Sequence, residues 1–170
     1  RKELKRIEEG LFPFITAAKK ARKPIRIGAN HGSLSDRILS RYGDTPLGMV
    51  ESAMEYLRIF QKYDYHDVVV AMKSSDPLVM IEANRLLSST LEREDMDYPI
   101  HLGVTEAGNA EDGRAKSTIG IGTSLLDGIG DTIRVSLTEA PEKEIPVCYS
   151  ILQATHRRIT KTEFISCPSC

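Results

Sequence analysis

The sequence predicts an α/β fold in which parallel strands alternate with helices. Short apolar segments rich in valine and isoleucine alternate along the chain with longer segments that have helical spacing. The longer segments at Pro46, Pro77 and Pro141 begin with proline, which suits the first turn of a helix because its N–H would have no intrahelical partner there. Repeated strand–helix units of this kind are typical of a parallel sheet.

The expected elements begin with a helix over residues 1–21, where apolar side chains recur at helical spacing. Four strand–helix units follow it. The predicted strands cover residues 23–30, 66–73, 98–105 and 131–138, and the predicted helices cover residues 46–63, 77–94, 113–128 and 141–155.

These units fit two architectures. A flavodoxin-like open sheet has about five strands with helices on both faces. A (β/α)₈ barrel needs eight units and about 250 residues, so four units with a preceding helix would form half of one. The spacing of the units leaves both architectures open.

The composition is that of an ordinary globular chain. Its 170 residues include 23 basic and 24 acidic side chains, for a net charge of −1, which argues against a general nucleic-acid binder. Three cysteines do not make a secreted disulfide framework, and no apolar run has the length of a membrane span. The chain begins at Arg1 inside a helical pattern, and we interpret it as an internal fragment of a longer protein.

Polar side chains occur on or just after every predicted strand. Because the carboxyl ends of parallel strands meet at one edge, we expect these side chains to surround one site. Three cations suit a multiply charged anion, since arginine binds phosphate oxygens bidentately and lysine supplies a point charge. Glu106 is then the only evident acid or base. The set is Arg26 and Asn30 on the first strand, Lys73 at the end of the second, Glu106 after the third, and Arg134 and Ser136 on the fourth.

Each of these residues also has a simpler interpretation. A single arginine at a strand end is commonly a solvated or paired surface residue. Arg26 and Arg134 lie within apolar strands, where an unpaired charge would be costly, and this favours the binding-site interpretation. His101 also lies within a strand, and we interpret it as an interior histidine with satisfied hydrogen bonds.

The chain ends in a Cys-x-x-Cys pair, Cys167 and Cys170. Two thiolates at this spacing suit zinc, a redox dithiol or an iron–sulfur cluster, and a metal site needs about four ligands. On spacing alone, a zinc knuckle is the preferred interpretation.

Several motifs together resemble those of the hydroxymethylbutenyl diphosphate synthase family, the iron–sulfur enzymes of the non-mevalonate isoprenoid pathway. The similarity extends from about Pro24 to the last residue, and the motifs occur in the family's order. They are IRIGANHGSLSDRI, MKSSD, HLGVTEAG, KSTIGIG, GDTIRVSL and EFISCPSC. The family has an eight-stranded TIM-type barrel followed by a small cluster-binding domain. The resemblance therefore implies that residues 1–156 form the C-terminal half of a TIM (β/α)₈ barrel and that residues 157–170 begin the iron–sulfur domain.

The resemblance also implies the chemistry. Enzymes of this family reductively open 2-C-methyl-D-erythritol 2,4-cyclodiphosphate to (E)-4-hydroxy-3-methylbut-2-enyl diphosphate, with a 4Fe-4S cluster and electrons from ferredoxin or flavodoxin. By resemblance, Glu106 handles a proton at the reacting centre, and Cys167 and Cys170 each bind an iron. A later cysteine and a later glutamate would complete the cluster site. The residues implied to hold the cyclic diphosphate are Arg26, Asn30, Lys73, Arg134 and Ser136.

Further expectations concern assembly and location. The short connection between Ser136 and Cys167 favours the family's arrangement in which the cluster domain caps the barrel of a second subunit, so we expect a homodimer of the full-length protein. We expect it in a bacterial cytoplasm or a plastid stroma, with neither nucleic acid nor a membrane as partner, and we expect this chain alone to be inactive. Two alternatives stay open. One is a non-catalytic α/β anion-binding domain with a zinc knuckle, and the other is a barrel that binds a pterin-like ligand.

Overall fold

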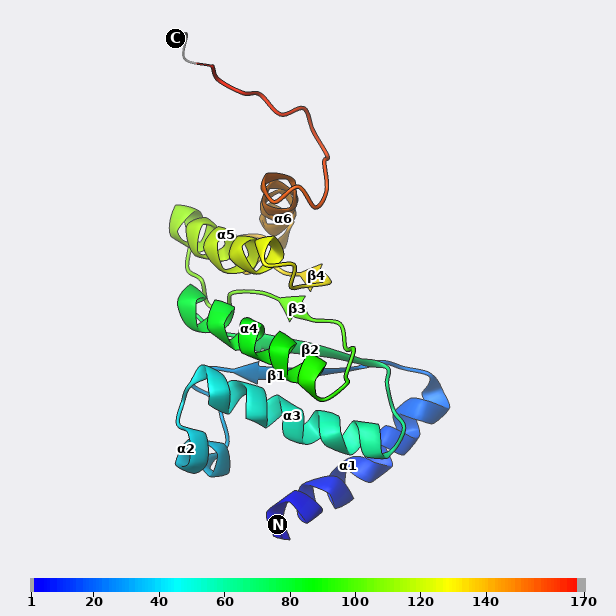
Figure 1. Cartoon of the computed structure of the whole chain (residues 1–170). Helices are drawn as coiled ribbons and strands as arrows, with labels where there is room; N and C mark the ends of the chain where they lie inside the picture. The colour runs from blue at the N-terminus through cyan, green and yellow to red at the C-terminus, as the bar shows by residue number, and fades with distance from the viewer. Residues whose placement is uncertain (1, 168–170) are drawn as a thin grey trace.

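A computed structural model describes residues 2–167 and shows strands alternating with helices. Figure 1 shows the helices α3, α4 and α5 in a row in front of the strands, with α1 at one end and α6 at the other. The elements, in chain order, are α1 (Lys2–Ala21), β1 (Ile25–Asn30), α2 (Asp36–Tyr42), α3 (Pro46–Lys62), β2 (Val68–Lys73), α4 (Pro77–Arg93), β3 (His101–Leu102), α5 (Ala110–Leu126), β4 (Thr132–Ile133), the 3₁₀ turn η1 (Pro141–Lys143) and α6 (Glu144–Ala154).

Two of the helices begin at the proline that the sequence predicts. Pro46 and Pro77 are the first residues of α3 and α4, and Pro141 opens the 3₁₀ turn that leads into α6. The preceding residues cap two of these helices. The Thr45 hydroxyl accepts the Gly48 N–H at 3.1 Å, and the Asp76 carboxylate accepts the Leu78 N–H at 2.8 Å. These side chains satisfy backbone donors that have no intrahelical partner.

The strands lie side by side in chain order. β1 pairs in parallel with β2 along its whole length, from Ile25 opposite Val68 to Asn30 opposite Lys73. A parallel bridge between Val70 and Ile100 joins β2 to β3, and β3 pairs in parallel with β4. A barrel keeps its strands in chain order, whereas an open doubly wound sheet reverses the order at its switch point. The structure therefore favours the barrel architecture, although these four strands do not close into a ring.

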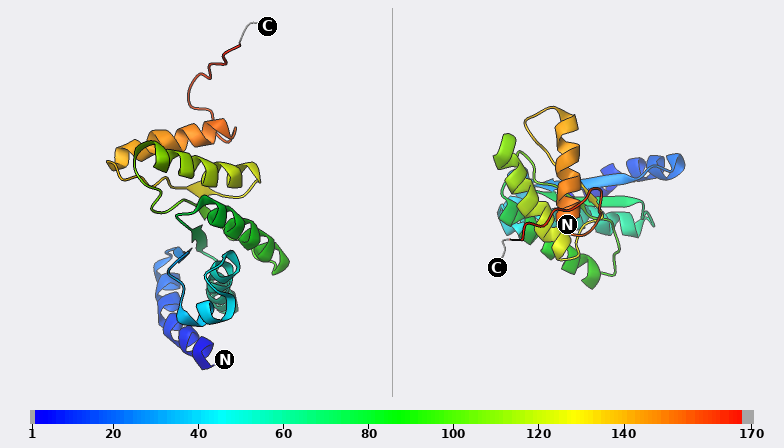
Figure 2. Two further views of the ribbon diagram at one scale, coloured as in Figure 1. Left: turned by 90° about the vertical axis from the view of Figure 1, so that its left-hand side faces the viewer. Right: turned by 90° about the horizontal axis from the view of Figure 1, so that it is seen from above.

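Helices α3, α4, α5 and α6 pack each against the next and form one curved layer along the strands (Figure 2). The core lies between this layer and the strands. In β1, the side chains of Ile25, Ile27 and Ala29 join the core, whereas Arg26 and Asn30 are exposed on the opposite face. The alternation along β1 thus separates a helix-covered face from an open face.

Two predicted strands are much shorter than expected. We predicted strands over residues 98–105 and 131–138, but regular pairing covers only β3 and β4, of two residues each. One reason is visible at Ile100, whose N–H donates to the Asp131 carboxylate at 2.8 Å and not to a backbone carbonyl of a ladder. Backbone hydrogen bonds beyond the regular pairing keep the two segments aligned further along the chain. The Arg134 N–H, for example, donates to the Leu102 carbonyl at 2.9 Å. The helix α2 was not predicted, and α5 begins at Ala110, ahead of the predicted residue 113.

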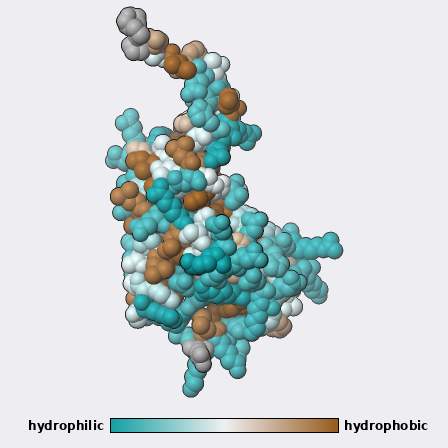
Figure 3. Space-filling view, viewed as in Figure 1, coloured by the Kyte–Doolittle hydropathy of each residue, from teal (hydrophilic) through white to brown (hydrophobic). Residues whose placement is uncertain are grey.

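Residues 157–167 form neither helix nor strand, and Figure 1 shows them leaving the folded body as an extended tail. Their apolar side chains are largely solvent-exposed, 77% for Ile159, 91% for Phe164 and 86% for Ile165. Figure 3 shows brown apolar groups along this tail. The tail therefore contributes little to the described core. In the described part of the chain, no helix is both long and apolar enough to cross a bilayer.

Candidate anion-binding site

The open face of the strands carries a row of residues that runs across all four strands. Asn30 and Lys73 are paired in the register of β1 and β2. The pairing of Val70 with Ile100 continues along both strands, so three residues further on Gly103 lies beside Lys73. In the same way, the pairing of His101 with Thr132 places Arg134 beside Gly103 two residues further on. A β-carbon built at Gly103 would lie 2.9 Å from the Arg134 carbonyl oxygen and 3.7 Å from Lys73 Nζ. The Lys73 ammonium therefore lies near β3, toward β4.

The three predicted cations lie close enough for the charges of two of them to affect the third. Burial lowers the pKa of Lys73, and the positive charges of Arg26 and Arg134 lower it further. None of the three side chains has an ion pair or a side-chain hydrogen bond with another residue in the described range 2–167. Like charges that repel one another without a counter-ion are costly unless a ligand neutralises them. This cluster of Arg26, Lys73 and Arg134 is called the cation cluster below.

Arginines on the helical surface contrast with the cation cluster. Arg58 donates to Glu94 at 2.7 and 2.9 Å, and Arg85 donates to Asp127 at 2.7 Å. Arg37 pairs with Glu55, and Arg114 pairs with Glu139, each through two hydrogen bonds. Carboxylates therefore neutralise these outer cations, whereas Arg26, Lys73 and Arg134 have no carboxylate partner in the described part of the chain.

His101 belongs to the same site, although the sequence analysis assigned it a structural role. Its Nδ1 lies 2.8 Å from the Thr132 hydroxyl, but its buried Nε2 has no hydrogen-bond partner within residues 2–167. The interpretation of a fully satisfied interior histidine was therefore wrong for one ring nitrogen. Burial, followed by the charges of Lys73, Arg26 and Arg134, lowers the pKa of His101 to about 4. Its place on the strand, two residues before Gly103, is the sequence signal that puts it on the open face.

Glu106 lies in the turn after β3 and is exposed. Its φ of 51° is in the left-handed region, which non-glycine residues adopt only at a cost. Glu106 is not among the charged groups that shift the pKa of Lys73 or of His101. The structure thus places Glu106 at the carboxyl edge of the strands without bringing it into the cation cluster. Asn30 is exposed and Ser136 half-buried, and neither side chain forms a hydrogen bond with a described residue.

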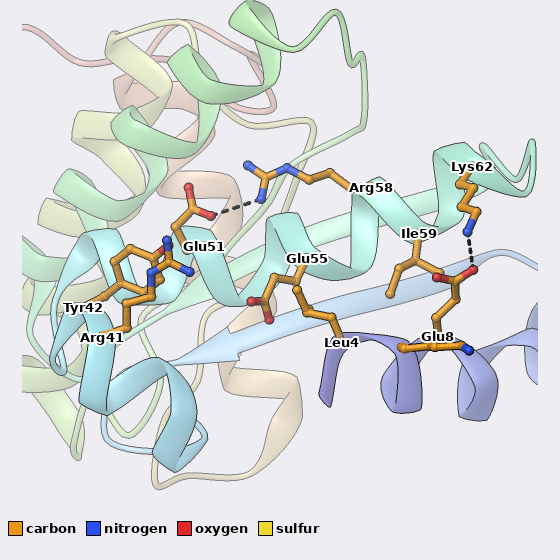
Figure 4. A pocket seen from close by; sticks show the side chains of 10 residues that line it. Leu4, Glu8, Arg41, Tyr42, Glu51, Glu55, Arg58, Ile59 and Lys62 are labelled. Carbon is orange, nitrogen blue, oxygen red and sulfur yellow. Dashed lines mark hydrogen bonds and ion pairs between the residues drawn. The ribbon is translucent and has the colours of Figure 1, made fainter. Parts of the chain in front are cut away.

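A cavity of about 590 Å³ lies on the outer surface between α1, α2 and α3 (Figure 4). Several of its charged side chains form ion pairs. Lys62 donates to Glu8 at 2.6 Å, and Arg58 donates to Glu51 at 3.1 Å. Since most of these charges are already compensated and the cavity lies on the helical side, it is a weaker candidate than the cation cluster.

The cysteines offer only part of a metal site. Cys167 is exposed in the tail, and Cys170 lies outside the described residues. Cys148 is half-buried in α6, and burial raises its pKa, so it is poorly suited to supply a thiolate. Residues 2–167 contain no group of three or more histidine, cysteine, aspartate or glutamate side chains placed to hold a metal ion.

Parallel strands in chain order, a single helical layer and an uncompensated cation cluster define part of a barrel-type α/β protein. The chain belongs to the family of the GcpE TIM-barrel domain, whose model matches residues 5–149. This match confirms the TIM-type architecture at the level of the family.

Sequence relatives agree with this assignment. The chain is 60% identical over 165 residues to a protein of Prochlorococcus marinus (strain MIT 9313) named 4-hydroxy-3-methylbut-2-en-1-yl diphosphate synthase (ferredoxin), covering 97% of this chain and 41% of that protein. Proteins of the same name from Parasynechococcus marenigrum (strain WH8102) and Picosynechococcus sp. (strain ATCC 27264 / PCC 7002 / PR-6) are 58% and 59% identical, each over 97% of this chain and 42% and 41% of their own lengths. The family resemblance inferred from the motifs is confirmed, and the chain spans well under half the length of these relatives.

Proposed function

We propose that this chain is the C-terminal half of the barrel of an enzyme that reductively opens 2-C-methyl-D-erythritol 2,4-cyclodiphosphate to (E)-4-hydroxy-3-methylbut-2-enyl diphosphate. In this proposal residues 1–156 bind the substrate, and residues 157–170 begin an iron–sulfur domain. The observation that carries the proposal is the uncompensated cation cluster on the open face. The names of relatives that are 58–60% identical supply the identity of the anion.

The cation cluster binds the diphosphate. Arg26 and Arg134 can each donate two parallel hydrogen bonds to phosphate oxygens, and the Lys73 ammonium supplies a point charge between the strands that carry them. Asn30 lies beside Lys73 in the register, and Ser136 follows Arg134 by two residues, so each can add a neutral hydrogen bond. Binding a dianion would also relieve the repulsion within the cluster, and a neutral ligand such as a pterin would not.

Glu106 is the proposed proton donor. The reaction breaks a ring C–O bond and releases a hydroxyl as water, which consumes two electrons and a proton. A carboxyl group at the carboxyl edge of the strands is placed where barrel enzymes carry their reacting groups. The left-handed backbone at Glu106 is consistent with this role, because strained conformations gather at functional sites.

A 4Fe-4S cluster, when bound, would supply the electrons to the substrate. Cys167 and Cys170 would provide two of its thiolate ligands, and the other ligands would come from outside this chain. Ferredoxin is the proposed electron donor in preference to flavodoxin, because the relatives are named for it. The homodimer, the location in a bacterial cytoplasm or plastid stroma, and the inactivity of this chain alone stay predictions.

The test uses the full-length protein, purified without oxygen. We expect about equal iron and sulfide, together with turnover of the cyclic diphosphate when reduced ferredoxin is supplied. Cys167→Ser should lose the cluster and the turnover, whereas Cys148→Ser, a matched change at the half-buried cysteine, should keep both. Bound zinc without sulfide, and no binding of the cyclic diphosphate, would support the zinc-knuckle alternative and overturn the proposal.

A further inference from the structure

His101 is the one described histidine whose ring is both buried and incompletely bonded. Its side chain is 9% exposed, and Nε2 has no hydrogen-bond partner within residues 2–167. An unsatisfied buried polar atom costs free energy that native proteins seldom accept without a reason. The other ring nitrogen, Nδ1, is held by the Thr132 hydroxyl at 2.8 Å, so the imidazole has a fixed orientation.

The surroundings of Nε2 leave room for a ligand. The strand registers place Gly28, Ala71, His101 and Thr132 in one row across the open face, next to the row that contains Lys73. Gly28 and Ala71 carry little or no side chain, and a β-carbon built at Gly28 would meet no atom within 4 Å. His101 is therefore the largest side chain of a row that is otherwise open toward β1.

The charges that face His101 are all positive. They come from Arg26 on β1, Lys73 at the end of β2 and Arg134 just after β4, and no carboxylate is among the groups that shift its pKa. A protonated imidazole is disfavoured beside three cations, so in the absence of a ligand the ring is neutral near pH 7. The Thr132 hydroxyl can donate to Nδ1, and in that tautomer the neutral imidazole carries its proton on Nε2.

We propose that His101 is a further ligand-binding residue of the anion site, oriented through Nδ1 by Thr132 and donating a hydrogen bond from Nε2 to the bound anion. This inference rests on the proposed function for the identity of the anion, the cyclic diphosphate. Thr132 acts as a positioning residue, because it contacts the imidazole and not the ligand.

The arrangement predicts that proton uptake accompanies binding. The anion offsets the charges of the cation cluster but not the burial that is the largest cause of the shift, so the pKa of His101 rises from about 4 part of the way toward its ordinary value of 6.5. Between these two pH values the free protein holds the ring neutral, and the complex can hold it protonated. Each phosphate of the cyclic diphosphate has one ester and one anhydride linkage and therefore only a single, strongly acidic proton, so the ligand itself takes up no proton in this range. Affinity should therefore rise as the pH falls through this window.

Calorimetric titration of the full-length protein with the cyclic diphosphate, in buffers of different ionisation enthalpy, tests both statements. We expect His101→Leu to bind at least about tenfold more weakly, the scale for a hydrogen bond to a charged group. His101→Gln should recover part of this loss because it keeps a donor, but it should show no proton uptake. Thr132→Val should weaken binding less than His101→Leu does.

His66→Gln, at an exposed histidine that bonds to Asp64, is the matched control and should bind like the wild type. Thermal unfolding of each variant separates lost binding from lost folding. Wild-type affinity in a folded His101→Leu protein, or undiminished proton uptake in His101→Gln, would overturn the inference while leaving the proposed function intact. Failure of the wild-type protein to bind the cyclic diphosphate would instead defeat the proposed function.

Discussion

Gly103 and Arg134 approach so closely that a β-carbon at position 103 would stand 2.9 Å from the Arg134 carbonyl oxygen. The contact is with a backbone atom of the neighbouring strand, which cannot swing aside as the end of a long side chain can. The absence of a side chain at Gly103 therefore lets β3 and β4 lie together at the level of the cation cluster. The same absence leaves space for the Lys73 ammonium, whose Nζ lies 3.7 Å from that β-carbon position.

Gly103→Ala should force the strands apart. We expect it to lower the free energy of unfolding of the full-length protein by about 1–3 kcal/mol, the usual cost of overpacking, and to weaken binding of the cyclic diphosphate. Gly10→Ala is the control, because Gly10 lies inside α1 and a β-carbon there would meet nothing within 4 Å. That change should stabilise the protein by about 0.5–1 kcal/mol through helix propensity. Urea denaturation of both variants measures the difference, and equal stabilities would contradict the close approach of the strands.

The cation cluster should show opposite effects on binding and on stability. Lys73→Met removes a charge that repels Arg26 and Arg134, so we expect unchanged or greater stability against heat. Binding of the cyclic diphosphate should nevertheless weaken by roughly tenfold to a hundredfold, as for the loss of a charge-assisted hydrogen bond. Arg85→Gln, which breaks an exposed ion pair with Asp127, should leave binding unchanged. A Lys73→Met protein that binds normally would remove Lys73 from the site.

Glu106 can be tested for chemistry separately from structure. Glu106→Gln keeps the shape but cannot deliver a proton, so we expect turnover to fall by about 10²-fold with substrate binding retained. Glu106→Gly should lose turnover as well, but it should not lower the free energy of unfolding, because glycine adopts the φ of 51° at this position freely. Single-turnover kinetics and urea denaturation check the two expectations. Normal turnover in Glu106→Gln would leave the residue with a structural role only.

The lowered pKa of His101 predicts how stability depends on pH. Between about 4 and 6.5 the unfolded chain holds His101 protonated while the ligand-free folded state holds it neutral, so the unfolded state binds more protons. Stability should therefore rise with pH across this window and fall as the pH drops toward 4.

His101→Gln should flatten this part of the profile. Lys73→Met should narrow this pH window by raising the pKa of His101, because the charge of Lys73 is the largest cause of the shift after burial. Thermal unfolding of the full-length protein at several pH values measures these slopes, and a His101→Gln profile parallel to that of the wild type would contradict the assignment.

Much of the fold could be predicted because its signals are local. Proline at Pro46 and Pro77 marks the first turns of α3 and α4, and the segments after them carry helical spacing. Strand alternation also put Arg26 and Asn30 on one face of β1, since neighbouring side chains of an extended chain must point to opposite sides. The motifs identified the family for the same reason, because a motif depends only on the order of residue types along the chain.

Only the tertiary structure decided which strands are neighbours. The order of β1, β2, β3 and β4 separates a barrel from an open sheet, and strand order depends on contacts between segments that are distant in sequence. Contacts of this kind also explain why β3 and β4 are shorter than predicted, since the Ile100 N–H donates to the Asp131 carboxylate and not to a carbonyl of the neighbouring strand.

The sequence by itself determined the strand–helix units, the proline starts of α3 and α4, and the set of polar residues on or just after the strands. The tertiary structure decided that Arg26, Lys73 and Arg134 face one another without a carboxylate partner in the described chain, and that His101 joins them with one nitrogen unsatisfied. The physical reason is that charge repulsion and hydrogen-bond satisfaction depend on distances in space. Residues on different strands acquire those distances only when the sheet forms.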